Sequence, residues 1–230
     1  NGVTIGGVLG TLVVPIPYLA EWTQRTNSFY SYYSINGVTY GNGMFVAVGY
    51  EGILTTSPDG ITWTRRTSSF GDTPIRGVAY GNGMFVAVGN AGKLATSPDG
   101  ITWTQRPSSF SSYLYIHRVT YGNGMFVAVG GGGELATSPD GITWTQRTSS
   151  FSGAPINGVA YGNGMFVAVG YDGKLATSPD GITWTQRTSS FGSTSINGVT
   201  YGNGMFVAVG CEGKLATSPD GITWTQRTSS

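Results

Sequence analysis

The side chains that could act in catalysis are few, and most of them recur at fixed positions of a repeating unit. Five of the eleven acidic residues are the aspartate of a Ser-Pro-Asp-Gly string, and five of the twelve basic residues are an arginine seven positions further on. A catalytic acid or base is needed once per site, so fivefold repetition favours a structural role. The repeated residues are Asp59, Asp99, Asp140, Asp180 and Asp220, with Arg66, Arg106, Arg147, Arg187 and Arg227.

The single histidine, His117, has no evident partner for acid–base or nucleophilic chemistry. Glycoside hydrolysis needs two carboxylates across one bond, and the repeated turn aspartates are spaced too widely to share a metal ion. Gly41-Asn42-Gly43 leads into a strand rather than a helix, so it does not have the context of a phosphate loop. We therefore expect a protein that is not an enzyme and that holds no metal and no cofactor.

Charge is sparse along the whole chain, with 10% charged residues and a formal net charge of +1. A nucleic-acid partner would require a strongly basic face, so none is expected. Abundant Thr, Ser, Asn and Gly with so little charge favours an extracellular or surface-displayed protein. Cys211 is the sole cysteine, which excludes a disulfide within the chain.

The elements that position these side chains come from a repeat of about forty residues. Five copies of Ile-Thr-Trp-Thr have tryptophans 40, 41, 40 and 40 residues apart. A repeat of this period is typical of propellers and solenoids. The companion string Gly-Met-Phe-Val-Ala-Val-Gly begins at Gly43, Gly83, Gly124, Gly164 and Gly204.

The first complete repeat predicts four strands joined by three short turns. Residues 35–40 form the first strand, and an Asn-Gly turn leads into the apolar run 44–48, which is typical of a strand covered on both faces. Residues 53–57 form the third strand. After a turn that contains proline and aspartate, residues 61–66 alternate between apolar and polar, as in a half-exposed strand.

These repeats predict an all-β fold, a five-bladed β-propeller whose blades are four-stranded antiparallel sheets. One such sheet cannot bury both of its apolar faces alone, whereas copies packed around an axis can. A linear stack of sheets is the alternative, and we expect the closed ring. Residues 27–230 would form the propeller, and residues 1–26 would form a leader outside it.

The string from Ser57 to Trp63 resembles the Asp-box repeat of sialidase-like propellers, in a variant that is one residue shorter between the aspartate and the tryptophan. The same string begins at Ser97, Ser138, Ser178 and Ser218, so it occurs in every repeat. The resemblance implies a propeller in which the box joins the third and fourth strands as a folding element. It does not imply glycosidase activity.

Differences among the five copies gather at one end of the predicted blades. The turns Tyr-Gly-Asn-Gly and Ser-Pro-Asp-Gly are identical in all copies, whereas the second-to-third turns and the crossovers between repeats vary. Variable loops on a rigid scaffold usually carry binding, although tolerant loops also drift. Tyrosine and asparagine suit such a surface because they give contact area and hydrogen bonds. The candidate ligand-binding residues are Tyr30, Tyr32, Tyr33, Asn36, Tyr50, Glu51, Arg76, Tyr113, Tyr115, His117, Arg118, Asn157, Tyr171, Asp172, Asn197 and Glu212.

Two functions are compatible with this pattern. The first is a binding module of the adhesin, lectin or phage receptor-binding type, whose variable face holds a glycan or a protein surface. The second is a structural bead of a surface fibre, filament or virion that has no small ligand and is linked through its leader.

The leader, residues 1–26, is apolar from Val3 to Ala20 but contains glycines and prolines and has no basic flank. We interpret it as extended chain rather than a membrane span or a signal peptide. The sequence of residues 21–26 is a degenerate copy of the fourth strand, and this segment could pair beside Ala216 in the last blade. Residues 222–227 compete for that place, and we expect them to win because their loop is shorter. An unpaired leader strand could then associate with a neighbouring molecule.

Overall fold

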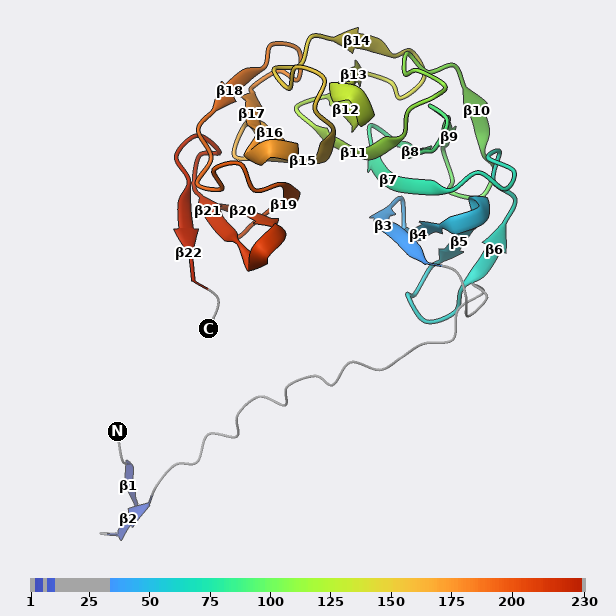
Figure 1. The fold of residues 1–230 in the computed structure, drawn as a ribbon. Helices are drawn as coiled ribbons and strands as arrows, with labels where there is room; N and C mark the ends of the chain where they lie inside the picture. Colours follow the sequence, from blue (N-terminus) through green and yellow to red (C-terminus); the bar gives the residue numbers. More distant parts are fainter. Residues whose placement is uncertain (1–2, 6–7, 11–33, 229–230) are drawn as a thin grey trace.

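The computed structural model describes residues 3–5, 8–10 and 34–228 of the chain. β1 (Val3–Ile5) and β2 (Val8–Gly10) form a two-stranded antiparallel sheet. The other strands form five four-stranded antiparallel sheets, each with its strands in sequence order, which confirms the five predicted blades (Figure 1). No helix in the described part of the chain has the length and apolar character needed to cross a membrane.

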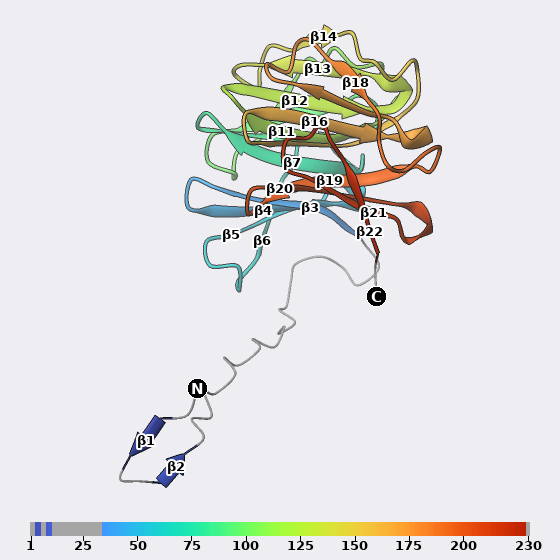
Figure 2. The same ribbon diagram turned by 90° about the vertical axis from the view of Figure 1, so that its left-hand side faces the viewer.

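Each blade runs from the centre of the molecule to its rim, and we number the blades 1 to 5 along the chain. Figure 2 shows the innermost strands running side by side along the axis about which the blades are arranged. The innermost strands are β3 (Ile35–Gly41), β7 (Ile75–Gly81), β11 (Ile116–Gly122), β15 (Ile156–Gly162) and β19 (Ile196–Gly202). The second strands are β4 (Met44–Gly49), β8 (Met84–Gly89), β12 (Met125–Gly130), β16 (Met165–Gly170) and β20 (Met205–Gly210).

The outer half of each blade is shorter. The third strands are β5 (Leu54–Ser57), β9 (Leu94–Ser97), β13 (Leu135–Ser138), β17 (Leu175–Ser178) and β21 (Leu215–Ser218). The rim strands are β6 (Thr64–Arg66), β10 (Thr104–Arg106), β14 (Thr145–Arg147), β18 (Thr185–Arg187) and β22 (Thr225–Arg227). In four blades the second and third strands are joined by a short 3-10 turn: η1 (Tyr50–Gly52), η2 (Gly131–Gly133), η3 (Tyr171–Gly173) and η4 (Cys211–Gly213).

The rim strand is shorter than predicted, because it begins at Thr64 rather than at residue 61. The carboxylate of Asp59 accepts hydrogen bonds from the backbone N–H groups of Ile61 and Thr62, at 2.8 Å and 2.9 Å, and holds these residues in the turn. Ile61 is consequently 49% exposed instead of packing on the sheet. The same bonds recur in all five blades, so the repeated aspartates are turn-forming residues.

The blades pack on one another through apolar side chains, as the continuous apolar runs predict. Trp103 belongs to a buried cluster that includes Val46 and Val48 of blade 1 and Phe85 of its own blade. Trp144, Trp184 and Trp224 pack against the corresponding clusters further along. The tryptophan of the repeated Ile-Thr-Trp-Thr string therefore packs between blades in four of the five copies.

A tyrosine on a glycine sets how closely consecutive blades approach. The Tyr80 ring covers Gly41 of the preceding blade so tightly that a Cβ at Gly41 would lie 2.0 Å from the ring. Three further pairs repeat this contact: Tyr121 on Gly81, Tyr161 on Gly122 and Tyr201 on Gly162. Only a residue without a side chain permits this approach, which explains the glycine at the end of each innermost strand.

The closed ring that we expected is not formed by the described residues. The blades form an open arc, and β3 of blade 1 makes no contact with β19 of blade 5 comparable with those between consecutive blades (Figure 1). Val38 of blade 1 is 61% exposed, whereas its equivalents Val78, Val119 and Val159 are each 8% exposed. Among the described residues, the five blades therefore do not complete the circle.

The last blade takes its rim strand from its own repeat, as expected. β22 pairs antiparallel with β21, and Ala216 lies opposite Gln226. The competing segment, residues 21–26, lies outside the described residues, and so does most of the leader.

Candidate functional site

The variable loops do lie together on one face. The second-to-third turn of each blade donates a backbone hydrogen bond to the crossover that precedes the blade, as from Gly131 to Tyr115 and from Tyr171 to Pro155, at 2.9 Å and 3.1 Å. On the opposite face, the invariant turns of consecutive blades are tied by asparagine side chains, as from Asn123 to the carbonyl of Pro179 at 3.1 Å. The segregation of variable from invariant turns is therefore a property of the folded molecule.

A β-bulge places one variable side chain of each innermost strand at the mouth of the central opening. The pairing between the first two strands of every blade shifts by one residue at this point, for example between Ile116 and Arg118. A bulge leaves one residue out of the ladder and re-aims its side chain. The residues at the bulge are Asn36, Arg76, His117, Asn157 and Asn197.

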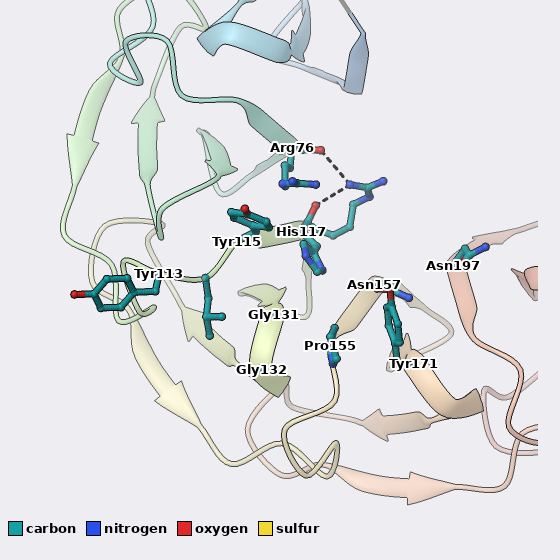
Figure 3. Close-up of a pocket in the computed structure, with 12 residues that line it drawn as sticks. Arg76, Tyr113, Tyr115, His117, Gly131, Gly132, Pro155, Asn157, Tyr171 and Asn197 are labelled. Atoms are coloured by element: carbon teal, nitrogen blue, oxygen red, sulfur yellow. Dashed lines mark hydrogen bonds between the residues drawn. The ribbon is translucent and has the colours of Figure 1, made fainter.

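Four of these bulge residues line one hollow of about 580 Å³ on the variable face (Figure 3). It extends over blades 2 to 5, from the crossover that precedes blade 3 to the η3 turn. Eight of the predicted candidates line it: Arg76, Tyr113, Tyr115, His117, Arg118, Asn157, Tyr171 and Asn197.

Two arginines stand side by side at one wall of the hollow. The Arg76 guanidinium lies over the Tyr115 ring, 4.6 Å from its centroid, and its Nε donates to Oδ1 of Asn90. Arg118 donates through Nη1 to the backbone carbonyls of Arg76 and His117, at 3.1 Å and 2.7 Å (Figure 3). Burial and the neighbouring Arg76 charge both lower the pKa of Arg118. These contacts fix the orientation of both guanidinium groups and leave several of their N–H groups without an acceptor among the described residues.

His117 is held in one orientation beside these charges. Its Nδ1 lies 2.9 Å from the carbonyl oxygen of Ile156 in the next blade, which can only accept, so Nδ1 carries the proton. Burial lowers the pKa of His117, and the charges of Arg76 and Arg118 lower it further, against the opposing effect of the Ile156 bond. The imidazole is therefore neutral at pH 7, with Nε2 as a hydrogen-bond acceptor.

Two of the predicted asparagines also form hydrogen bonds between consecutive blades. The Nδ2 atoms of Asn36 and Asn157 each donate to the isoleucine carbonyl of the next blade, Ile75 or Ile196, at 2.9 Å. Asn157 keeps its side-chain oxygen as an acceptor at the hollow. Asn197, in the last described blade, lies instead beside Sγ of Cys211, at 3.6 Å from Nδ2.

The remaining candidates are not brought to this hollow. Asn36 and Tyr50 belong to blade 1, at the open end of the arc. Glu51 lines a separate depression with Asp72. Asp172 and Glu212 occupy left-handed positions of their turns, with φ of 55° and 57°, and Glu212 pairs with Lys214 at 3.5 Å. Tyr30, Tyr32 and Tyr33 lie outside the described residues.

Four residues of the hollow were missed by the sequence analysis: Leu114, Pro155, Gly131 and Gly132. The glycines replace the larger residues that the other copies carry in this turn, such as Tyr50 and Tyr171. Loss of those side chains leaves the space that becomes the hollow, and a Cβ at Gly132 would already lie 2.8 Å from Leu114. The unusual run of glycines in the third copy was the signal available in the sequence.

The arrangement presents positive charge and hydrogen-bond donors, which suit an anion. None of the lining residues is acidic, so His117 has no carboxylate there to orient it and no second acid to work with. Among the described residues, no group of three or more His, Cys, Asp or Glu is placed to hold a metal ion. What the hollow does offer is two fixed guanidinium groups, several hydrogen-bond acceptors and three tyrosine rings.

Comparison with known proteins places this fold among the propellers. Residues 98–226 match the sequence profile described as the DUF6242 beta propeller domain. The YCF48 structure described as bound to D1 peptide has 19% identity and a TM-score of 0.65, covering 84% of this chain and 68% of that one. A structure of virginiamycin B lyase from Staphylococcus aureus has 13% identity and a TM-score of 0.73, and the match covers 84% of this chain and 69% of that one.

The structure titled nidogen/laminin complex is also similar, with 12% identity and a TM-score of 0.65, covering 84% of this chain and 78% of that one. No curated protein matches the sequence. At these identities the likeness shows the fold alone, and it includes both a lyase and propellers seen in complexes.

Proposed function

The chain belongs to the DUF6242 beta propeller domain family, and on that scaffold we propose that it is a non-enzymatic binding module that holds its ligand on the variable face. The single observation that carries this proposal is that candidate residues from several blades lie around one space in the folded molecule. Eight candidate residues, taken from positions that vary among the copies, line one hollow.

The ligand that we propose is a protein surface or a peptide segment, with a glycan as the alternative. Two structurally similar propellers were solved in complexes, YCF48 with D1 peptide and nidogen with laminin, which supports this choice at the level of the fold. The Tyr, Asn and Arg side chains of the hollow suit recognition because they provide rigid contact area and directed hydrogen bonds. An adhesin or a phage receptor-binding head, displayed outside the cell, would use such a face.

The absence of catalysis belongs to the same proposal. The repeated Ser-Pro-Asp-Gly strings act as non-catalytic Asp-box turns, because each aspartate is consumed by backbone hydrogen bonds of its own turn. The imidazole of His117 is tied to Ile156 and has no acid beside it. A lyase with this fold shows that the scaffold can support catalysis, so the proposal rests on these side chains rather than on the fold.

A structural bead remains the second candidate, and one observation favours it. The faces of blades 1 and 5 that look onto the gap expose large apolar side chains, among them Val38 and Val209 at 61% and 45%. Apolar faces of this kind are typical of surfaces that pack against other protein. A bead would use these faces and would leave the hollow empty.

The two candidates are separated by a binding screen of the full chain against arrayed host-surface proteins, peptides and glycans. We expect binding of one ligand class and its loss in a Tyr113→Ser, Tyr115→Ser double variant. Both side chains are exposed, at 91% and 46%, so the melting temperature should change little. Binding that survives this double change would overturn the assignment of the face.

Asn123→Ala is the matched control on the opposite face. It removes the bond to Pro179 and places alanine where φ is +46°, so we expect a loss of about 1–3 kcal/mol in unfolding free energy. Ligand binding at a temperature well below unfolding should stay unchanged. Equal effects of the two changes on binding would show that the variable face has no special role.

A further inference from the structure

The charge of the hollow is unbalanced. Arg76 and Arg118 both line it, and no acidic residue does. Neither guanidinium is joined to a carboxylate by any ion pair or hydrogen bond of the described residues; their acceptors are Asn90 and the two backbone carbonyls. The repeated arginine of the rim strand is instead bonded to a threonine hydroxyl, as Arg106 is to Thr96 at 2.9 Å.

Two like charges held together raise the free energy of the empty site. Burial lowers the pKa of Arg118, and the Arg76 charge lowers it further, which is the electrostatic sign of this repulsion. An anion placed between the guanidinium groups would relieve it. Arginine donates through a planar fork that matches a carboxylate, so the unused N–H groups of both residues suit that anion.

The rest of the lining indicates what carries the carboxylate. Leu114 and Pro155 contribute apolar surface to the lining, which also includes the rings of Tyr115 and Tyr171. Figure 3 shows the Tyr171 ring close to Pro155. Apolar side chains on a ligand would pack in such a place. Sugars lack such side chains, so Leu114 and Pro155 favour an amino-acid chain over a glycan. Nε2 of His117 and the side-chain oxygen of Asn157 are acceptors that suit peptide N–H groups.

We propose that the hollow binds an acidic peptide segment, whose carboxylate lies between Arg76 and Arg118 while its neighbouring apolar side chain packs on Leu114 and Tyr115. This inference rests on the proposed function and narrows it to one ligand chemistry. The carboxylate can come from an Asp or Glu side chain or from a chain terminus, and the experiment separates these sources.

The repeat itself supplies variants that remove the charge with little risk to the fold. The position of Arg118 is glycine in the other four copies (Gly37, Gly77, Gly158 and Gly198), and the position of Arg76 is asparagine in three (Asn36, Asn157 and Asn197). Arg118→Gly and Arg76→Asn therefore install residues that the same blade architecture already holds. Arg65→Gln is the matched control. It removes one positive charge on blade 1, outside the hollow, and also restores the residue found in the other copies, as at Gln105.

The probe is an array of short peptides with randomised sequences, printed once with free and once with amidated C-termini. We expect the full chain to enrich peptides that pair Asp or Glu with an apolar residue. Replacement of the acid by its amide should weaken binding about tenfold or more, as should Arg118→Gly or Arg76→Asn in the protein. Arg65→Gln should bind like the unchanged protein. Enrichment confined to free C-termini would assign the carboxylate to the terminus.

Two results would overturn the inference, and they are distinct. If neutral peptides or glycans bind equally well and Arg118→Gly has no effect, while Tyr113→Ser, Tyr115→Ser abolishes binding, the face binds but not through a carboxylate. If no peptide, protein or glycan binds in a way that the tyrosine variant disrupts, the proposed function fails along with it. A melting temperature for each variant within a few degrees of the unchanged protein shows that loss of binding is not loss of folding.

Discussion

His117 illustrates how one side chain can serve the scaffold and the surface together. Its Nδ1–H bond to Ile156 occupies the place of the asparagine bonds in neighbouring blades, such as Asn157 to Ile196. Its ring meanwhile faces the charges of Arg76 and Arg118. The histidine is therefore a substitution that the repeat tolerates, because asparagine and neutral histidine both present a nitrogen donor to the same carbonyl.

Protonation of His117 should destabilise the fold. The pKa of His117 is lowered from its ordinary value of 6.5, so below that pH the unfolded chain binds a proton that the folded protein resists. Stability should accordingly fall as the pH drops from 7 through 6.5 and below. We expect His117→Asn to keep the interblade bond and to lose this dependence, measured as unfolding free energy between pH 7 and pH 5. Parallel curves for the two proteins would contradict it.

The Ser-Pro-Asp-Gly turn is the element that the repeat preserves most strictly. In blade 2, Asp99 accepts from the N–H groups of Ile101 and Thr102 and from the Ser97 hydroxyl, at 2.8 Å, 2.9 Å and 2.9 Å. The indole N–H of Trp103 closes the same turn on the Gly100 carbonyl at 2.8 Å. The turn thereby places the tryptophan against the preceding blade, which links a local hydrogen-bond pattern to the packing between blades.

These turns should make the fold sensitive to acid. The bond from Thr102, with those from Ile101 and Ser97, lowers the pKa of Asp99 below its ordinary 3.8 against the effect of burial, and the other four turn aspartates are shifted the same way. A lowered pKa contributes stability that is present above pH 3.8 and is lost as the pH falls through the folded-state value. We expect Asp99→Asn to melt lower at pH 7 and to approach the unchanged protein as the pH falls below 3.8.

Asp72→Asn is the control for this change, because Asp72 lies in a crossover, where it lines the depression beside Glu51, and not in a Ser-Pro-Asp-Gly turn. Its melting temperature should follow that of the unchanged protein over the whole range. A constant difference between Asp99→Asn and the unchanged protein down to low pH would show that the carboxylate charge does not contribute.

At the scale of the whole molecule, the open arc leaves the gap-facing sides of blades 1 and 5 without a partner among residues 3–5, 8–10 and 34–228. Blade 5 presents Gly202 with nothing within 4 Å of where a Cβ would stand, whereas its equivalent Gly162 is covered by the Tyr201 ring. Blade 1 presents the matching tyrosine, Tyr40, which is 57% exposed. The tyrosine and the glycine thus pack together in the four interfaces between consecutive blades, whereas both are exposed at the gap.

A pair of glycine substitutions tests whether the arc is open in solution. Gly162→Ala would bring a Cβ to 2.0 Å from the Tyr201 ring, and we expect it to cost about 1–3 kcal/mol or more in unfolding free energy. Gly202→Ala meets no neighbour and should be close to neutral. Equal destabilisation by the two changes, measured by denaturant unfolding, would show that the gap-facing surface of blade 5 is packed against something.

The sequence by itself determined the number of blades and the order of strands within each of them. Both depend on local signals, namely the Asn-Gly and Pro-Asp-Gly turns and the apolar runs between them, which are complete within about forty residues. It also separated the variable from the invariant turns, because an up-and-down meander leaves no choice about which turns share an end. Eight of the twelve residues that line the hollow were among the candidates that this separation singled out.

Only the tertiary structure decided the rest. The start of the rim strand depends on which N–H groups Asp59 captures, and the aim of Arg76 and His117 depends on a bulge that leaves no mark in the sequence. The open arc and the width of the hollow depend on how far each blade turns relative to the last. This arrangement depends on contacts between residues about forty positions apart, such as that of the Tyr80 ring with Gly41, so it exists only once the blades have packed.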